Sequence, residues 1–274
     1  MSSTRTHLPD LSSRHDLDDA LVAGYRRDGH TLVQGLASPP EVTAYRQIIG
    51  DATRRHGAQT LPLEQRDTYG KAFVQVANLW RHDEVVARFV LADRFAAVAA
   101  RLLGVDQVRI YHDQALYKEP GGGPTPWHQD CLYWPFDTDL TITMWMPLVD
   151  VAADMGGLSF ASGSWRERAL GEHVISDESD EFFEQLLTDG RFPVYEPGRM
   201  AAGDATFHAG WTLHRARPNN SEILREVMTV IYVAADVRVA DPTNREQEVD
   251  LAKWLHGHAI GDLVAGDEHP ALPA

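Results

Sequence analysis

The sequence predicts an α+β protein that is mainly β, with a β-barrel or β-sandwich braced by N-terminal helices. Two observations support this fold class. The first hundred residues have helical periodicity, whereas later segments are rich in β-branched and aromatic residues and are separated by loops that carry proline and glycine. Helices do not alternate with the strands, which argues against a doubly wound parallel sheet.

Three early segments have helical apolar spacing: 16–27, 40–55 and 83–103, the last of which fits a helix pair. The second begins at two prolines, which suit a first helical turn because the N–H groups there have no helical acceptor. The third ends at Gly104, since glycine often terminates helices. Ahead of them, residues 1–15 are polar, and we expect this segment to be disordered.

The predicted strands follow in the second half of the chain, at 108–118, 141–151, 200–208 and 225–237. One helical segment, 177–188, interrupts them, and the tail has no strong pattern. We therefore expect a single domain, 16–274, with a helical flank at about 16–104, a β core at about 105–240 and a C-terminal tail at 241–274.

Composition limits the partners and the compartment. The chain has 274 residues and a formal net charge of −15, which disfavours nucleic acids and anionic membranes because both bind basic surfaces. Cys131 is the single cysteine, so an intramolecular disulfide is excluded. The sequence contains no apolar run of about 18 residues and no apolar N-terminal leader. A cytoplasmic protein without membrane or nucleic-acid partners is expected.

The strongest local metal-binding pattern is His128, Gln129 and Asp130. Residues i and i+2 of an extended segment point to the same face, so the imidazole and the carboxylate can converge on one ion. They supply two of the three protein ligands in the facial triad of non-haem Fe(II) oxygenases. A strand-end salt bridge is the alternative, since about one His-x-Asp is expected by chance in a chain with thirteen histidines.

A further imidazole must come from a distant segment, and His214 can supply it. His208 is a rival, but His214 lies at a more suitable spacing from Arg225, which opens an apolar run typical of a buried strand. A buried guanidinium needs an anion, and it can bind a carboxylate through two parallel hydrogen bonds. A dicarboxylate cosubstrate would meet this need; a structural ion pair with Asp or Glu is the alternative.

Several motifs follow one another in order: Trp127-His128-Gln129-Asp130, Trp145-Met146-Pro147, Met155-Gly156-Gly157-Leu158-Ser159-Phe160, Ser162-Gly163-Ser164, Gly203-Asp204, and the stretch from His214 to Arg225. In this order the chain resembles the phytanoyl-CoA dioxygenase family, whose members are Fe(II)- and 2-oxoglutarate-dependent oxygenases. The resemblance runs from about Tyr25 to Tyr232. It implies a double-stranded β-helix core, also called a jelly roll or cupin-like fold, with flanking N-terminal helices.

The resemblance also implies roles for individual residues. His128, Asp130 and His214 would hold Fe(II) and so carry catalysis, and Arg225 would pair with the distal carboxylate of 2-oxoglutarate. Gln114 and Trp145 match cosubstrate-contact positions, and Thr143 shares a face with Trp145. The implied cofactors are Fe(II), 2-oxoglutarate as cosubstrate, and O2.

The substrate pocket is expected to use aromatic and polar side chains near these motifs. Trp134 falls where a related hydroxylase keeps an active-site tryptophan, and Lys118 shares a strand face with Gln114; core packing and an exposed charge are the respective alternatives. The remaining candidates, chosen for their closeness to the motifs, are Phe73, Gln75, Tyr117, Phe207 and Trp211.

Two positions depart from the family pattern. Many relatives have serine two residues after the distal histidine, where this chain has Ala216, so one cosubstrate hydrogen bond is missing. Many also have histidine after the Gly-Ser pair, where this chain has Trp165. Asp130 occupies the position that halogenating relatives give to a small residue, which favours oxygenation.

The resemblance therefore implies a dioxygenase that hydroxylates a small organic molecule, such as a secondary-metabolite intermediate, with release of succinate and CO2. Desaturation, cyclisation, epoxidation and epimerisation use the same residues. The alternatives from other classes are a non-catalytic cupin-like binding protein and a zinc hydrolase with the same triad. A hydrolase has no use for Arg225, whereas a cosubstrate has. A monomer or weak homodimer is expected.

Overall fold

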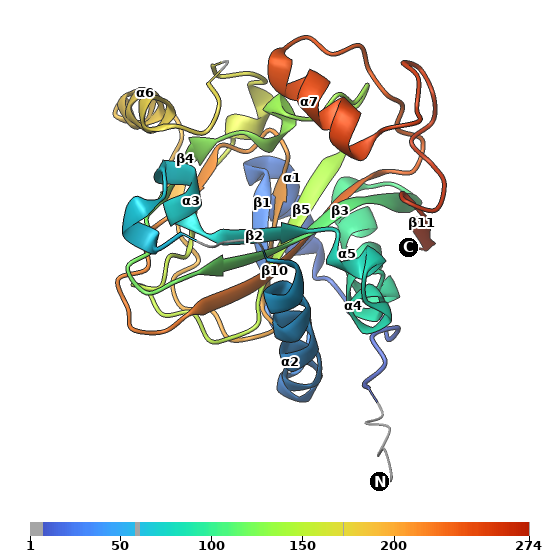
Figure 1. Cartoon of the computed structure of the whole chain (residues 1–274). Helices are drawn as coiled ribbons and strands as arrows, with labels where there is room; N and C mark the ends of the chain where they lie inside the picture. The colour runs from blue at the N-terminus through green and yellow to red at the C-terminus, as the bar shows by residue number, and fades with distance from the viewer. Residues whose placement is uncertain (1–7, 58–60, 172, 274) are drawn as a thin grey trace, which may run out of the picture.

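Two antiparallel sheets enclose the functional part of the molecule in this computed structural model, which describes residues 8–57, 61–171 and 173–273 (Figure 1). The larger sheet has the strand order β1-β8-β5-β10-β3-β11, and β2 also pairs with β3. Its strands are β1 (His30–Val33), β2 (Val74–Ala77), β3 (Gln107–Lys118), β5 (Thr141–Pro147), β8 (Ala205–Ala209), β10 (Arg225–Ala234) and β11 (Ala271–Pro273).

The smaller sheet has the order β4-β9-β6-β7. Its strands are β4 (Thr125–His128), β6 (Leu158–Ala161), β7 (Val194–Tyr195) and β9 (His214–Ala216). Because every pairing in both sheets is antiparallel and the two sheets share one interior, the architecture is the expected jelly roll, and the prediction of a mainly β fold is confirmed. The division into a flank, a core and a tail stays a prediction.

Helices cover the outer face of the larger sheet. The helices before the core are α1 (Asp19–Asp28), α2 (Pro39–His56), α3 (Thr68–Ala72), α4 (Glu84–Val90) and α5 (Asp93–Leu103). Apolar side chains of α2, α4 and α5 pack in one cluster with Ile142, Met144 and Met146 of β5. Successive strand residues point to opposite faces, so Thr143 and Trp145 of the same strand face the interior.

The segment 83–103 forms two helices, as its apolar spacing predicts. The chain breaks at Leu91 and Ala92, and α4 and α5 each pack apolar residues into the main core. Asp83 caps α4 by accepting hydrogen bonds from the backbone N–H groups of Val85 and Val86. Neither proline nor glycine marks the position of the break.

The N-terminal segment differs from the expectation of disorder where it is described. Residues 1–7 of the expected disordered stretch lie outside the described residues. Leu11 is buried, its carbonyl accepts from the N–H of Arg94, and the Arg94 guanidinium donates to the carbonyl of Ser13. Tyr45 also donates its hydroxyl to the carbonyl of Pro9. The expectation of disorder is therefore wrong for 9–13, because the buried contact of Leu11 and these hydrogen bonds offset the loss of chain entropy.

The tail forms regular structure that its sequence did not indicate. It contains α7 (Arg245–Trp254) and ends in β11, which pairs with the first residues of β3. Helix α6 (Asp177–Leu187) lies in the insertion between β6 and β7, close to its predicted position. In Figure 1, α6 and α7 lie on the same end of the sheets, well away from α2.

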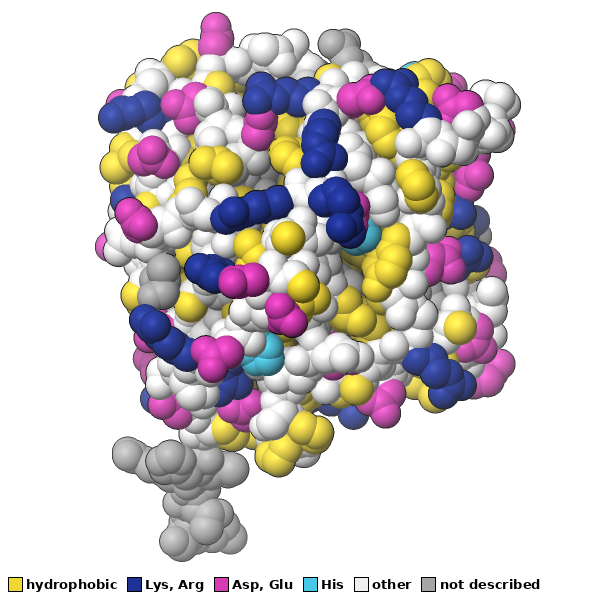
Figure 2. Space-filling model, turned by 180° about the vertical axis from the view of Figure 1, so that it is seen from behind, with side chains coloured by type: hydrophobic (Ala, Val, Ile, Leu, Met, Phe, Trp, Pro, Cys, Tyr) yellow, Lys and Arg dark blue, Asp and Glu magenta, His cyan; other side chains and the backbone are white. Residues whose placement is uncertain are grey.

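The surface carries charges of both signs. On the face seen in Figure 2, basic and acidic side chains are interspersed with apolar ones. Of the helices in the described ranges, none is long and apolar enough to cross a membrane.

Candidate metal centre

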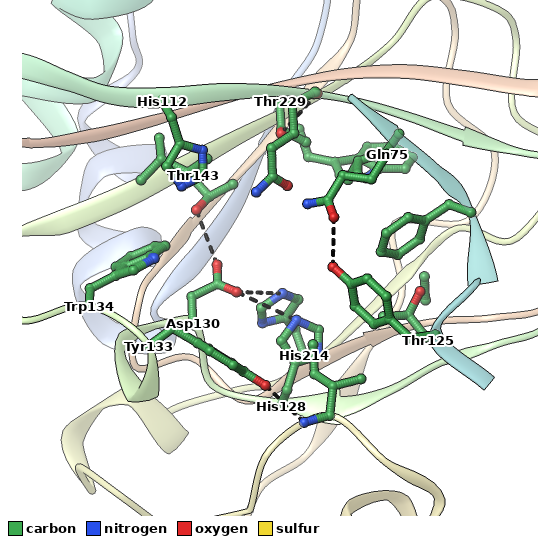
Figure 3. Close-up of a pocket in the computed structure, with 18 of the residues that line it drawn as sticks. Gln75, His112, Thr125, His128, Asp130, Tyr133, Trp134, Thr143, His214 and Thr229 are labelled. Atoms are coloured by element: carbon green, nitrogen blue, oxygen red, sulfur yellow. Dashed lines mark hydrogen bonds and ion pairs between the residues drawn. The ribbon is translucent and has the colours of Figure 1, made fainter. Parts of the chain in front are cut away.

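A cavity of about 460 Å³ lies between the two sheets, and residues of α3 and α7 also line it. Strands of both sheets contribute to its wall, and so does the segment that precedes α6. Its lining combines aromatic and aliphatic side chains with polar and charged groups in about equal number. Figure 3 shows these side chains converging on its centre.

Two imidazoles and one carboxylate meet at the base of the cavity. His128 ends β4 and His214 begins β9, and the two residues are partners across these strands. Asp130 follows in the short turn after β4. Its Oδ1 lies 3.5 Å from Nε2 of His128 and 3.8 Å from Nε2 of His214, and the three donor atoms all lie within 4.8 Å of one another. The three groups could therefore hold one metal ion.

Backbone carbonyls hold both imidazoles through the same ring nitrogen, Nδ1. Nδ1 of His128 lies 2.7 Å from the carbonyl oxygen of Pro126, and Nδ1 of His214 lies 2.9 Å from that of Thr212. If each Nδ1 donates its hydrogen to the carbonyl, each Nε2 is left with a free lone pair facing Asp130. This tautomer is the one that a metal requires.

Electrostatics favour a neutral imidazole beside a charged carboxylate. Burial and the neighbouring rings of His128 and His208 hold the pKa of His214 well below its ordinary value. Burial by itself would raise the pKa of Asp130, but the surrounding histidines, with His214 foremost, hold that pKa well below its ordinary value. Metal ligands need these two protonation states.

The second oxygen of Asp130 has its own partners. Thr143 donates its hydroxyl to Oδ2 at 3.2 Å, and Nε2 of His208 lies 3.5 Å from the same oxygen. The threonine was predicted to contact the cosubstrate; it lines the cavity, but its hydroxyl bonds to Asp130. The rival ligand His208 is buried, and it lies beside the close group of three ligand atoms rather than within it.

Two buried basic side chains lie near one end of the cavity: Arg225 lines it, and Lys118 lies behind its wall. Arg225 opens β10 opposite Lys118 of β3, and both side chains are buried. Arg225 donates one hydrogen bond, to the carbonyl of Gly156, while its Nε has no partner. Burial lowers the pKa of Arg225 to about 9, and burial together with Arg225 lowers the pKa of Lys118 to about 6.

Neither cation has an acidic partner among the described residues. A buried charge without a counter-ion is costly, so this wall is arranged to receive an anion. Trp145 stacks beside the guanidinium of Arg225, with 5.3 Å from Cζ to the ring centroid. Gln114, Trp145, Ala216 and Arg225 all line the cavity, and Thr125, the cross-strand partner of Ala216, lines it with a hydroxyl that has no hydrogen-bond partner in the described part of the chain.

Three of the seven predicted substrate-pocket residues line the cavity: Phe73, Gln75 and Trp134. Tyr117 and Phe207 do not, because they point to the opposite face of the larger sheet and pack among the helices. Lys118 faces inward, but its ammonium is buried behind the wall and donates to the carbonyl of Gly123. Trp211 lies beyond the end of β8 and donates its indole N–H to Asp139. The prediction that these four line the pocket is wrong.

Some lining residues escaped the sequence analysis. Tyr69, His112 and Tyr133 belong to segments whose positions depend on the folded chain. The tail adds a larger group from α7: Glu246, Asp250, Lys253 and Trp254. The i, i+4, i+8 spacing of Glu246, Asp250 and Trp254 was visible in the sequence, but the direction of that face was not.

Comparison with known proteins gives a consistent assignment. The family model for phytanoyl-CoA dioxygenase matches residues 25–227. A probable alpha-ketoglutarate-dependent hypophosphite dioxygenase of Stutzerimonas stutzeri is 24% identical over 226 residues, covering 77% of each chain. The 1-deoxypentalenic acid 11-beta-hydroxylase of Streptomyces exfoliatus is 24% identical, covering 81% of this chain and 82% of the relative. The crystal structure of SnoK, a non-heme alpha ketoglutarate dependent carbocyclase from nogalamycin biosynthesis, superposes with a TM-score of 0.77 at 25% identity, covering 94% and 97% of the two chains.

Proposed function

The chain belongs to the phytanoyl-CoA dioxygenase family, and from that membership we propose which of its residues carry the reaction. The protein is a non-haem iron- and 2-oxoglutarate-dependent dioxygenase, an oxidoreductase whose cosubstrate is 2-oxoglutarate. Its substrate is a small molecule. The residue roles, the reaction outcome and the substrate class are the matters proposed below.

We propose that His128, Asp130 and His214 hold the iron. Two neutral imidazole nitrogens and one carboxylate oxygen facing a cavity match the donor set of a facial triad, which leaves open positions for other ligands. The bound iron would supply the activation of O2. The chain's own contribution is to hold the three donor atoms and to keep water out by means of the aromatic wall.

Arg225 is proposed to bind the distal carboxylate of 2-oxoglutarate. The observation that carries this role is the buried guanidinium of Arg225, which lines the cavity, leaves its Nε without a hydrogen-bond partner and has no acidic partner among the residues described. A dicarboxylate that reaches from the triad to this wall would neutralise part of that charge. A purely structural arginine would be expected to have an acidic neighbour.

The proposed reaction is hydroxylation of a small organic molecule, such as a secondary-metabolite intermediate, with release of succinate and CO2. The relative from Streptomyces exfoliatus is a hydroxylase, which supports this outcome. Cyclisation is the second candidate, because the structure of SnoK, a carbocyclase, resembles this chain over nearly its whole length. A non-catalytic binding protein is disfavoured, because all three donor groups are present.

The remaining properties are the oligomeric state, the compartment and the partners of the enzyme. We propose a monomer or a weak homodimer in the cytoplasm, without nucleic-acid or membrane partners. The net charge of −15 supports the absence of anionic partners. The single cysteine, which is buried and unpaired, fits a reducing compartment.

The test combines binding and turnover. Under anaerobic conditions, Fe(II) and 2-oxoglutarate added to the protein should produce the charge-transfer absorption of their chelate, and O2 should then release succinate. Asp130→Ala and His214→Gln should abolish both signals. His256→Gln, which removes an exposed imidazole, is the matched control and should retain both. A chelate of undiminished affinity in Asp130→Ala would overturn the ligand assignment.

A further inference from the structure

Helix α7 presents a polar face to the cavity. Glu246, Asp250 and Trp254 recur every four residues, so they lie along one face of the helix, and all three line the cavity together with Lys253. Glu248 lies on the outer side, exposed and paired with Arg245. A helix that covers an apolar pocket would be expected to turn apolar residues inward, so this inward polar face needs a separate explanation.

The two carboxylates of this face have no cationic partner within ion-pair distance among the described residues. Asp250 accepts a hydrogen bond from the Tyr111 hydroxyl. Burial raises the pKa of Asp250 to about 7, against the opposing effects of Tyr111 and Lys253. Lys253 places its ammonium over the Trp254 ring, 4.3 Å from the centroid. Glu246 has no hydrogen-bond or ion-pair partner among the described residues, so this wall keeps a carboxylate acceptor that a ligand could use.

A second polar group on the same wall also lacks a partner. His112 of β3 is 3% exposed, and its Nδ1 has no hydrogen-bond partner. Its ring stacks on Trp254 with centroids 4.9 Å apart, and it lines the cavity near Trp134 and Thr143 (Figure 3). Burial lowers the pKa of His112 to about 3, so its ring is neutral and can both donate and accept.

We propose that Glu246, Asp250 and His112 bind a hydrogen-bond donor on the substrate, a hydroxyl or a protonated amine, at the α7 side of the cavity. This inference rests on the proposed function and defines its substrate class. Glu246 and a partly ionised Asp250 face the single ammonium of Lys253, so near neutral pH this wall keeps a small negative balance that disfavours an anionic end group. Trp254 and Trp134 supply apolar faces for the body of such a substrate.

Three probes with one body and different ends test the proposal: phenethylamine, 2-phenylethanol and phenylacetate. Each is titrated by calorimetry into anaerobic protein loaded with Fe(II) and 2-oxoglutarate. The amine and the alcohol should each have a dissociation constant at least about tenfold lower than that of phenylacetate. The first two gain a charge-assisted hydrogen bond to a carboxylate, whereas phenylacetate is repelled by it. Tighter binding of the amine than of the alcohol would assign a cationic end, and the reverse order a neutral hydroxyl.

Variants of α7 locate the preference. Asp250→Asn and Glu246→Gln keep the side-chain shape but remove a charge from the inner face, and they should reduce the preference for the amine about tenfold. Glu248→Gln removes the same charge from the outer face and is the matched control, which should keep the wild-type preference. His112→Phe, which keeps an aromatic ring for the stack with Trp254, should weaken the alcohol and the amine alike.

The Fe(II)–2-oxoglutarate absorption distinguishes failure of the proposed function from failure of the α7 proposal. If wild-type protein with Fe(II) and 2-oxoglutarate shows no charge-transfer absorption, the proposed function is contradicted. With that absorption intact, the α7 proposal is overturned if the probes bind equally or not at all, or if phenylacetate binds most tightly. It is also overturned if Glu248→Gln changes the preference as much as Asp250→Asn.

Discussion

Thr143 and His208 are direct partners across β5 and β8, and both side chains approach the same atom, Oδ2 of Asp130. The other oxygen, Oδ1, faces the Nε2 atoms of His128 and His214. The larger sheet thus sets the rotation of a carboxylate that belongs to the smaller sheet. Groups of this kind, which orient a ligand without touching the metal, tune metal affinity.

Removal of either partner of Oδ2 should weaken metal binding. We expect His208→Ala and Thr143→Val each to raise the dissociation constant for Co(II) by about 10- to 100-fold, because Asp130 loses its fixed rotation. Calorimetric titration measures the constant, thermal unfolding checks the fold, and His256→Gln is the control. An unchanged constant in both variants would show that Asp130 is oriented by its backbone alone.

Arg225→Gln should weaken cosubstrate binding without affecting the metal. Loss of a charge-assisted pair costs about 1.5–3 kcal/mol, which corresponds to a rise of roughly 10- to 150-fold in the dissociation constant for 2-oxoglutarate. The measurement is a titration of the anaerobic Fe(II) protein with 2-oxoglutarate. Arg217→Gln, which removes an arginine paired with Glu196 outside the cavity lining, is the control. Equal effects of the two variants would refute the assignment of Arg225.

Lys118→Met should raise the free energy of unfolding of the cosubstrate-free protein. The pKa of Lys118 is lowered from 10.5 to about 6 on folding, so the unfolded chain binds more protons between these values. The free energy of unfolding should therefore rise with pH across this window in the wild type. The variant should lose that slope and gain about 1–4 kcal/mol near pH 7. Urea unfolding over this pH range is the measurement, and a steeper slope in the variant is the contrary result.

His30 should contribute to acid lability. Burial lowers its pKa from 6.5 to about 4, with Asp28 opposing, so its stabilising contribution is present above about pH 6.5 and is lost as pH falls toward 4. His30→Gln should flatten the decline in stability over this window by up to about 3 kcal/mol. Acid unfolding followed by circular dichroism gives the decline, compared with His256→Gln. If both variants decline like the wild type, His30 has no part in acid lability.

The local signals of the candidate site were readable from the sequence. The i, i+2 spacing of His128 and Asp130 places both side chains at one point, and Arg225 stood out as a charge inside an apolar run. Strand alternation also placed Gln114 on the inner face. The same alternation puts Tyr117 on the outer face, where it packs behind the sheet; this residue was chosen for its closeness to the motifs, which does not indicate the direction of a side chain.

Contacts between distant segments could not be predicted. His208 lies beside Asp130 because β8 pairs with β5, a registration that no local pattern specifies. Helix α7 covers the cavity because of how the tail returns to the sheet, and its polar face resembles that of any exposed helix. Sequence periodicity gives the faces of an element but not the surface that each face meets.

The strands that flank α7 have a consequence for how the enzyme can diversify. Ala234, at the end of β10, and Leu272, in β11, are both partners of Val108, so the intervening stretch leaves and rejoins the sheet at one residue. Four residues of this stretch, Val237, Val239, Leu255 and Val264, are buried in one cluster with Tyr111 and Trp134. Sequence change in α7 can therefore alter the cavity wall only while these apolar contacts beneath it are kept.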